Sequence, residues 1–246
     1  MIDLTNVTFC IPVRIDSVER LENLDIVLGF LLANFDTNIH IWEDGPTQIL
    51  NNVVAKYTFV ENKDPIFYRT RILNNLVKDN PTNIVAIYDA DVLLPVSRYV
   101  EAVQILRNNE ADVVWPYAGV FVNVPYDTKI LELINTPDLI AGEIVGFDST
   151  GGAIFWNRSK FIEIGMENEH FVSWGVEDRE MLIRVLQLGF RYFRLDGMIY
   201  HLDHPRGINS GRTNPHFEAN DAEYYRIYEM NPDHLRKEIE TWPWTK

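Results

Sequence analysis

The chain has 246 residues, of which 46% are hydrophobic and 24% charged, so it is a globular chain rather than a disordered one. Since domains usually contain about 100 to 200 residues, this length predicts one domain and excludes a long multidomain protein. The 22 basic and 36 acidic residues give a net charge of -14, which disfavours binding to nucleic acid or anionic lipid.

Short β-branched or aromatic runs alternate with longer stretches of helical periodicity in the first half. Helices are expected at 68–79, at 98–109 and between the first two strands, where Asp16 with Glu19 makes a capping-box-like start. The expected strands are residues 7–13, 39–42, 57–60, 84–88 and 113–115. This alternation predicts an α/β fold, with a mixed, mostly parallel sheet flanked by helices.

The second half is less regular and predicts a mixed extension of the sheet. The expected strands are 119–124, 151–157, 192–195 and 198–202, and the expected helices are 158–164 and 177–188. From residue 217 the chain has two helical stretches, broken at Asn231 and Pro232. Trp242 and Trp244 are expected to anchor this tail on the body, since exposed indoles reduce solubility.

The single cysteine, Cys10, lies in an apolar run and is expected to be a small buried side chain. A lone cysteine cannot form an internal disulfide, so we expect a reducing, cytoplasmic compartment. The first residues lack the pattern of a signal peptide, and apolar runs stay shorter than about 18 residues. We therefore expect neither secretion nor a transmembrane segment.

The strongest local motif is the pair Asp89 and Asp91 at the end of the apolar run IVAIYDADV. Residues two apart on a strand face the same side, so both carboxylates are expected to project together from a central strand. Open α/β sheets bind ligands at this edge, and a divalent cation would relieve the repulsion between the carboxylates. The alternative is a polar turn, in which Asp is common.

A second motif, MIYHLDHPRG, places His201 and His204 at the end of an expected strand. Imidazole and carboxylate ligands together favour a transition ion such as Mn²⁺ over Mg²⁺. Two histidines at this spacing are a weak signal alone, because surface histidines are common. The signal gains weight because both motifs end strands that can converge in one sheet.

A third group of residues lies in GGAIFWN and SWGVEDRE. Gly152 permits a close approach of the backbone to a ligand, and Trp174 offers a flat face for a sugar. Glu177 and Asp178 open a helix, where the macrodipole favours carboxylates, so a purely structural role explains them as well. At a helix start we expect the pKa of Asp178 to be lowered.

In this order, IPVR, WED, the DAD motif, GGAIFWN, WGVED and HLDHPRG resemble metal-dependent glycosyltransferases of the GT-A fold. The likeness is greatest to the group of β-1,4-galactosyltransferases and chondroitin-polymerase-type bacterial transferases, and it covers roughly residues 7–206. It implies one GT-A domain with a nucleotide-binding half (1–116), an acceptor and catalytic half (117–206) and a C-terminal helical tail (207–246).

The resemblance implies an inverting transferase, dependent on Mn²⁺ or another divalent cation, that moves a hexose or N-acetylhexosamine from a UDP-sugar to a saccharide or glycolipid hydroxyl. Galactose-type donors are favoured. Asp91 and His201 would bind the metal, with Asp89 and His204 as further candidates, and Asp178 would be the catalytic base. The expected substrate-binding residues, from the resemblance and from the residues themselves, are Pro12, Arg14, Asp44, Arg69, Asp89, Gly152, Trp174 and Glu177.

The galactosyltransferase motif WGGEDDD is WGVEDRE here, so Val176 and Arg179 depart from it and leave donor and acceptor open. The expected setting is polysaccharide or glycolipid synthesis, without nucleic acid as a partner and with peripheral membrane association left open.

Three alternatives remain at this stage. A phosphatase of the haloacid-dehalogenase type also carries a DxD motif, but that motif generally opens the first strand, whereas three expected strands precede Asp89. A nucleotidyltransferase would want a glycine-rich loop after the first strand, and IPVRIDS contains no glycine. A non-catalytic nucleotide-sugar or carbohydrate-binding protein would keep the pocket, although the presence of both DxD and the Glu177–Asp178 pair argues against it.

Overall fold

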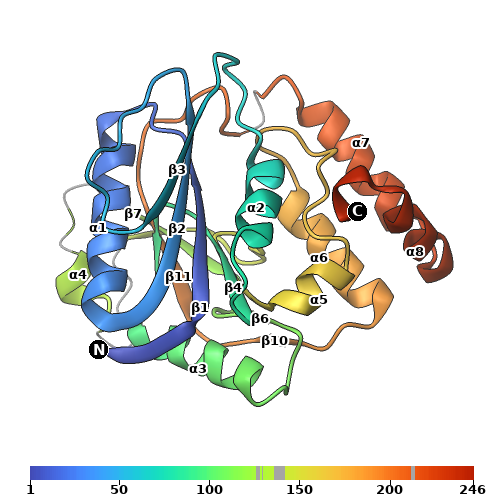
Figure 1. Cartoon of the computed structure of the whole chain (residues 1–246), viewed down its shortest axis with the longest axis horizontal. Helices are drawn as coiled ribbons and strands as arrows, with labels where there is room; N and C mark the ends of the chain where they lie inside the picture. The colour runs from blue at the N-terminus through green and yellow to red at the C-terminus, as the bar shows by residue number, and fades with distance from the viewer. Residues whose placement is uncertain (126–127, 129, 136–141, 212–213) are drawn as a thin grey trace.

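The computed structural model describes residues 1–125, 128, 130–135, 142–211 and 214–246. Within these residues the strands form one seven-stranded and one four-stranded sheet. The central strands of the larger sheet lie between α1 (Val18–Asn34) and α2 (Arg69–Lys78), as Figure 1 shows. The structure confirms the predicted α/β class, with a mostly parallel sheet flanked by helices.

Parallel pairs dominate the larger sheet, because β1 pairs in parallel with β2 and β4, β2 with β3, and β10 with β6. The mixed character comes from β9, which runs antiparallel to both β4 and β6. In spatial order the strands are β10 (Tyr192–Arg194), β6 (Val113–Trp115), β9 (Ala153–Asn157), β4 (Ile84–Tyr88), β1 (Ile2–Val13), β2 (Phe35–Gly45) and β3 (Lys56–Glu61).

The smaller sheet joins the two motifs that the sequence singled out. Its strands, in spatial order, are β5 (Val92–Leu93), β11 (Met198–Leu202), β7 (Val120–Val124) and β8 (Glu143–Gly146). β11 pairs antiparallel with β5, and His201 lies opposite Val92 in that ladder. Because β5 begins directly after Asp91, this pairing brings His201 beside the aspartate.

The remaining helices of the described chain are α3 (Val96–Arg107), α4 (Ile130–Leu133), α5 (Arg158–Glu163), α6 (Glu177–Leu188), α7 (Phe217–Tyr228), α8 (Pro232–Thr241) and a 3-10 turn (Pro243–Thr245). Each helix that the structure describes is too short or too polar to cross a membrane. Cys10 is fully buried, as expected.

The start of α1 corrects one expectation. Ser17, rather than an Asp16–Glu19 box, caps the helix, because its hydroxyl accepts a hydrogen bond from the backbone N–H of Arg20 at 3.2 Å. This is the side-chain cap that satisfies one of the free N–H groups of a first helical turn. Arg20 therefore occupies the third position of the helix.

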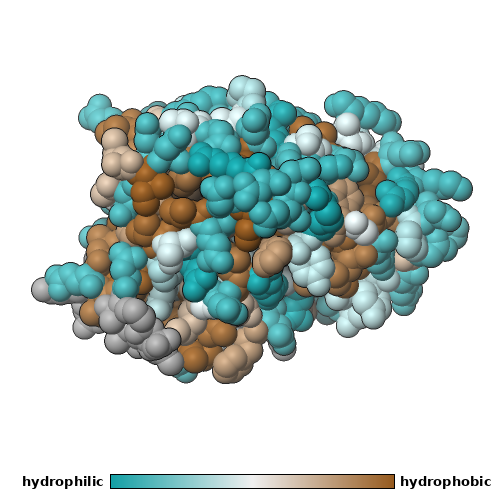
Figure 2. Space-filling model, turned by 90° about the horizontal axis from the view of Figure 1, so that it is seen from below, coloured by the Kyte–Doolittle hydropathy of each residue, from teal (hydrophilic) through white to brown (hydrophobic). Residues whose placement is uncertain are grey.

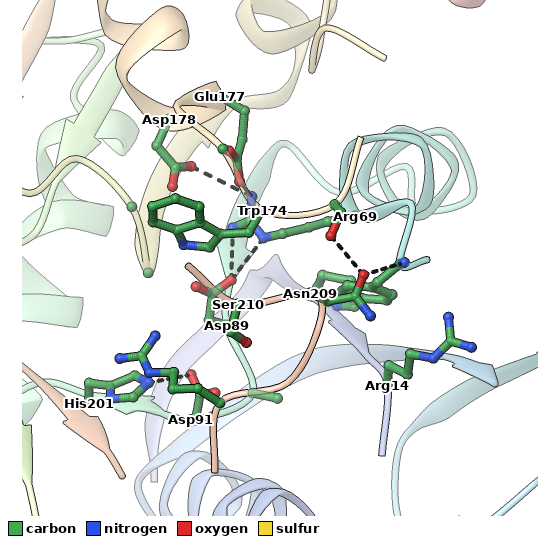
Figure 3. Close-up of a pocket in the computed structure, with 18 of the residues that line it drawn as sticks. Arg14, Arg69, Asp89, Asp91, Trp174, Glu177, Asp178, His201, Asn209 and Ser210 are labelled. Carbon is green, nitrogen blue, oxygen red and sulfur yellow. Dashed lines mark hydrogen bonds and ion pairs between the residues drawn. The ribbon is translucent and has the colours of Figure 1, made fainter. Parts of the chain in front are cut away.

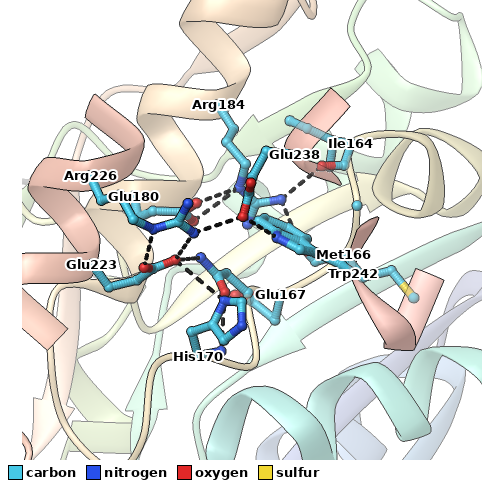
Figure 4. A network of polar contacts seen from close by, with 12 residues as sticks. Ile164, Met166, Glu167, His170, Glu180, Arg184, Glu223, Arg226, Glu238 and Trp242 are labelled. Carbon is cyan, nitrogen blue, oxygen red and sulfur yellow. Dashed lines mark hydrogen bonds and ion pairs between the residues drawn. The ribbon is translucent and has the colours of Figure 1, made fainter. Parts of the chain in front are cut away.

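The C-terminal tail is anchored on α6, as predicted from its tryptophans. Trp242 and Trp244 are buried, and the guanidinium of Arg184 lies 5.2 Å from the ring of Trp242. Arg184 is itself fully buried and donates to Glu180 at 2.8 Å and to two carbonyls of the 164–166 segment (Figure 4). This network fixes the middle of α6, the helix that begins with the last two residues of the motif WGVED.

The molecular surface is mixed in character. On the face in Figure 2, hydrophilic side chains cover much of the area, and the apolar groups form several separate areas. Large exposed apolar side chains come from many elements and include Val54, Phe147 and Tyr225. Scattered apolar residues of this kind are normal for a globular protein and do not by themselves indicate a docking site.

Candidate active site

A cavity of about 550 Å³ lies at the carboxyl ends of β1 and β4, the edge at which open α/β sheets bind ligands. The end of β1, the turn after β4, the end of β11, the 173–176 loop and the start of α6 all contribute to its lining, partly shown in Figure 3. Eleven predicted site residues line it: Pro12, Arg14, Arg69, Asp89, Asp91, Gly152, Trp174, Glu177, Asp178, His201 and His204.

Asp44 is the predicted site residue that does not line this cavity. It is buried at the end of β2, where its Oδ2 lies 3.5 Å from Arg14 Nη1 and accepts a hydrogen bond from Asn62 Nδ2 at 3.1 Å. Burial raises the pKa of Asp44, and Asn62 and Arg14 oppose the rise. Asp44 therefore contacts Arg14 from behind the cavity wall.

Arg14 lies at the cavity wall, but much of its guanidinium is engaged by the protein. Nη1 donates to the carbonyl of Ile66 at 2.8 Å, and Nη2 donates to the carbonyl of Asp64 at 2.5 Å. These bonds join the end of β1 to the loop after β3. The positive charge of Arg14 faces this loop and Asp44, and lies apart from Asp91 and His201 (Figure 3).

Asp91, His201 and His204 form a buried cluster with the composition of a metal site. One ligand atom from each residue lies within 4.8 Å of the other two. Asp91 Oδ1 is 3.9 Å from His201 Nε2, and Asp91 Oδ2 is 3.2 Å from His204 Nε2. Burial favours a higher pKa for Asp91, but the two histidines and Arg20 outweigh burial and lower it.

Both imidazoles are oriented for metal binding. His201 Nδ1 lies 2.8 Å from Asn123 Oδ1, and His204 Nδ1 lies 2.9 Å from the carbonyl of Pro205. In the tautomer that donates through Nδ1, each ring directs the lone pair of Nε2 toward Asp91, as outer partners do for metal-ligating histidines. Two imidazoles and a carboxylate suit Mn²⁺ or a similar ion, so these residues fit the expected metal.

Asp89 is engaged elsewhere in this structure. Its Oδ1 accepts hydrogen bonds from Arg69 Nε at 3.2 Å and Nη2 at 2.7 Å. The expectation that Asp89 and Asp91 project together from a strand is wrong, because β4 ends at Tyr88 and the chain turns before β5. The two carboxylates therefore have different partners, and a metal contact for Asp89 stays a prediction.

A buried charge cluster surrounds Arg69 at the other side of the cavity. Arg69 Nη1 lies 3.6 Å from Glu177 Oε1 and 3.6 Å from Asp178 Oδ1. Burial and the neighbouring Asp178 raise the pKa of Glu177 to about 8, and burial raises the pKa of Asp178 against the effect of Arg69. One arginine thus faces three carboxylates, with Asp89 as the third.

The raised pKa of Asp178 corrects the lowered value expected for a carboxylate at a helix start. Asp178 is the second residue of α6, which follows Val176 as its N-cap, and no described side chain caps this helix. Burial therefore outweighs the helix macrodipole at this position. A carboxylate with a raised pKa is a stronger proton acceptor once ionised.

Gly152 has a backbone φ of +83°, a left-handed conformation that favours glycine. Its carbonyl accepts a hydrogen bond from the backbone N–H of Asp89 at 2.8 Å. The GGAIFWN segment is thereby joined to the turn that carries both aspartates.

Trp174 is half-buried in the cavity wall, and its ring stacks on Phe217 of α7 with centroids 6.0 Å apart. The segment around Trp174 is tied to α7. Asn220 Nδ2 donates to the carbonyl of Trp174 at 3.0 Å, and a Cβ on Gly175 would come within 2.6 Å of that amide. The indole belongs to the cavity rather than to the core.

Sequence reasoning missed several residues that support this cavity. Arg20 reaches Asp91, Asn123 orients His201, and Asn209 accepts hydrogen bonds from Ser173 Oγ at 2.7 Å and from a backbone N–H. The two asparagines carried no local signal. Arg20 carried one, because a cation in the first turn of a helix opposes the macrodipole.

One family model matches part of the chain. Residues 146–206 match the family model described as the N-terminal domain of galactosyltransferase. A search of curated proteins finds no match. The match includes the segments of Gly152, Trp174, Asp178 and His201, and it confirms that the chain is galactosyltransferase-like there.

Two solved structures of Drosophila β1,4-galactosyltransferase 7 are similar to the chain. The catalytic domain in complex with xylobiose has 16% identity and a TM-score of 0.48, and a point mutant in complex with manganese, UDP-Gal and xylobiose has 14% identity and a TM-score of 0.49. Each match covers 79% of this chain and 65% of the other, so the chain spans less than two thirds of those proteins.

Proposed function

We propose that this galactosyltransferase-like chain is a metal-dependent glycosyltransferase of the GT-A type. It transfers a sugar from a UDP-sugar to a hydroxyl of a saccharide or glycolipid. One observation carries the proposal: a single cavity contains both a cluster suited to a divalent cation and a carboxylate with a raised pKa, Asp178. The Arg69–Asp89 pair lies between these two groups (Figure 3).

Asp91, His201 and His204 would hold the cation. When bound, a divalent cation supplies Lewis-acid stabilisation to the diphosphate leaving group. The pairing of β5 with β11 holds these ligands together in the absence of donor. The ligands therefore need little rearrangement when the cation and donor bind. Arg69 orients Asp89 at the floor of the same cavity through two hydrogen bonds.

Asp178 is proposed to accept the proton of the acceptor hydroxyl. The bond from the anomeric carbon to the UDP oxygen breaks, the acceptor oxygen forms the new bond, and its proton passes to the carboxylate. Oδ1 of Asp178 has no hydrogen-bond partner among the described residues, although Arg69 lies nearby. The side chain of Asp178 as a whole is 24% exposed and lines the cavity, so an acceptor hydroxyl can reach its carboxyl group.

Trp174 is proposed to hold the acceptor. Its indole lines the same cavity as Asp178 and is supported by Phe217, on which it stacks. Sugars stack on aromatic faces, so this ring can orient a saccharide whose hydroxyl faces the carboxylate.

The finer parts of the proposal concern stereochemistry, donor and setting. Inversion with a hexose or N-acetylhexosamine donor, galactose-type favoured, follows from the likeness of WGVED and HLDHPRG to the galactosyltransferase motifs. Polysaccharide or glycolipid synthesis follows from the same likeness. The cytoplasmic setting is supported by the lone buried thiol of Cys10.

A screen of UDP-sugars for Mn²⁺-dependent release of UDP tests the proposal. We expect one donor to be consumed slowly with Mn²⁺ alone, faster with a saccharide acceptor, and not at all with a chelator. A protein that binds UDP and Mn²⁺ but consumes none of the UDP-sugars would instead be a non-catalytic nucleotide-sugar-binding protein.

A further inference from the structure

Arg20 reaches from the first turn of α1 into the candidate metal cluster. Its Nη1 donates to Asp91 Oδ2 at 3.2 Å, and its Nε donates to Asp16 Oδ1 at 3.0 Å. The side chain is 17% exposed and lines the cavity. The positive charge of Arg20 thus contacts Asp91, the carboxylate of the candidate metal cluster.

The position of Arg20 is unfavourable for the helix itself. The N-terminus of an α-helix carries a partial positive charge, so a cation in its first turn is destabilising unless anions compensate it. Asp16 and Asp91 supply that compensation here. The ion pairs with Asp16 and Asp91, and not the helix dipole, therefore stabilise Arg20 in this position.

Nδ1 of His204 lies near both a donor, Arg20, and an acceptor, the carbonyl of Pro205. Arg20 Nη2 lies 3.3 Å from His204 Nδ1, and a guanidinium can only donate, so this contact is a hydrogen bond only in the tautomer with an unprotonated Nδ1. A metal ligand at Nε2 requires the opposite tautomer, with the proton on Nδ1 and directed to the carbonyl of Pro205. In that tautomer the N–H groups of Arg20 and His204 face each other and repel.

Binding of a cation also changes the second partner of Arg20. Asp91 Oδ2 accepts from Arg20 and faces His204, and it is one of the oxygens that can bind a cation. A divalent charge at this carboxylate repels the guanidinium nearby. Both contacts of Arg20 within the cluster are thus weakened by the same event, while the bond to Asp16 can persist.

We propose that Arg20 alternates between two anions: it neutralises Asp91 when the metal site is empty, and it binds the donor's diphosphate when a divalent cation is bound. This inference rests on the proposed function. Asp16, Arg20 and Asp91 together carry one negative charge, so a bound divalent ion leaves this group positive, which suits the negative charge of a diphosphate. Guanidinium groups suit phosphate because their N–H groups bond in pairs.

Two binding measurements test the proposal on the purified full chain. Mn²⁺ affinity is measured first, from the loss of the free-Mn²⁺ EPR signal without nucleotide. UDP affinity is then measured by calorimetry at saturating Mn²⁺. Arg20→Ala should bind Mn²⁺ more tightly, on the order of 10-fold, because a competing cation is removed. The same variant should bind UDP more weakly, on the order of 10-fold, because a charge-assisted hydrogen bond is lost.

Two further variants separate this role from a structural one. Arg20→Lys keeps the charge but loses the paired N–H groups, so Mn²⁺ affinity should stay near the wild-type value while UDP affinity falls part of the way. Arg98→Ala is the matched control, because Arg98 pairs with Glu101 on α3 at the surface and should change neither affinity. Melting temperatures show whether each variant is folded.

The opposite signs of the two effects make the proposal falsifiable. An Arg20→Ala protein that binds both Mn²⁺ and UDP more weakly would show that Arg20 only supports the fold of the cluster. Unchanged affinities in a protein whose wild type binds both ligands would overturn the Arg20 proposal and leave the proposed function intact. A wild type that binds neither Mn²⁺ nor UDP would overturn both.

Discussion

Asp178 packs its carboxylate against Gly151, where a Cβ would come within 2.1 Å of Asp178 Oδ2. Gly151 precedes β9, whereas Asp178 lies in α6, so the contact joins two segments of the cavity wall. The carbonyl of Gly151 also accepts a hydrogen bond from Tyr117 at 2.6 Å, which fixes this segment from behind. The glycine therefore determines where the carboxylate can lie.

Replacing Gly151 with alanine should displace Asp178 without touching the metal ligands. We expect the rate of sugar transfer to fall about 10 to 100-fold, because a small misplacement of a catalytic group has effects of this size. Affinity for UDP with Mn²⁺ should persist. Gly29→Ala on α1 is the matched control, since a Cβ there meets nothing within 4 Å. A Gly151→Ala protein with a normal transfer rate would disconnect this contact from catalysis.

Asp178→Asn separates the roles of base and structural carboxylate. A neutral amide cannot accept the proton of the acceptor hydroxyl, so transfer at saturating donor should fall about 10² to 10⁴-fold. UDP and Mn²⁺ should still bind, because Asp91 and the two histidines lie on other segments. Rates, UDP affinity and melting temperature are measured together. A nearly normal transfer rate in a folded mutant would assign the base to another residue.

Trp174→Ala tests the proposed acceptor wall. The indole lines the cavity while its ring rests on Phe217, so its loss should spare Mn²⁺-dependent hydrolysis of the UDP-sugar and suppress transfer to every acceptor. Assays of hydrolysis and transfer on the same preparation provide the comparison. A large fall in melting temperature with both activities lost together would indicate that Trp174 serves the core.

Glu167→Gln should change how stability depends on pH. Glu167 is almost fully buried, and burial raises its pKa from 4.5 to about 7. The folded protein therefore holds this proton more tightly than the unfolded chain does. This contribution to the free energy of unfolding is fully present below pH 4.5 and is lost as the pH rises through 7, about 3 kcal/mol in total.

The glutamine variant lacks this titration, so its free energy of unfolding should decline less between pH 5 and pH 8 than that of the wild type. Denaturant unfolding at several pH values measures the difference. Parallel curves for the two proteins would mean that Glu167 is ionised, or solvated, in the folded state.

Local sequence pattern was sufficient for several elements of the fold, although it gave only part of the two longest strands, β1 and β2. β4, β6, β11 and α6 have the predicted bounds, because apolar runs and helical periodicity mark them clearly. β5, β8 and α4 were missed, since two to four strand residues or a single helical turn carry no measurable period. β5 matters most, because its pairing with β11 assembles the candidate metal cluster.

The sequence predicted the site residues that belong to local motifs. It did not predict properties that depend on contacts between distant segments. Asp91 and His201 end strand motifs, and the sheet brings them together. The raised pKa of Asp178 results from its burial, and Arg69 of α2 opposes the rise. The motif WGVED alone predicts neither the burial nor the neighbouring arginine. The family resemblance placed Asp44 near the donor, whereas in the structure Asp44 contacts the guanidinium of Arg14 and does not line the cavity.

The central claim is that Asp91 is the charged ligand of a cation on which donor binding depends. Asn keeps the shape of Asp91 but loses the charge that holds a divalent cation. Calorimetric titration of UDP into the wild type and Asp91→Asn, each with and without Mn²⁺, tests the claim most directly. We expect Mn²⁺ to strengthen UDP binding to the wild type and to have no effect on folded Asp91→Asn. Wild-type, Mn²⁺-dependent affinity for UDP in the mutant would contradict the claim.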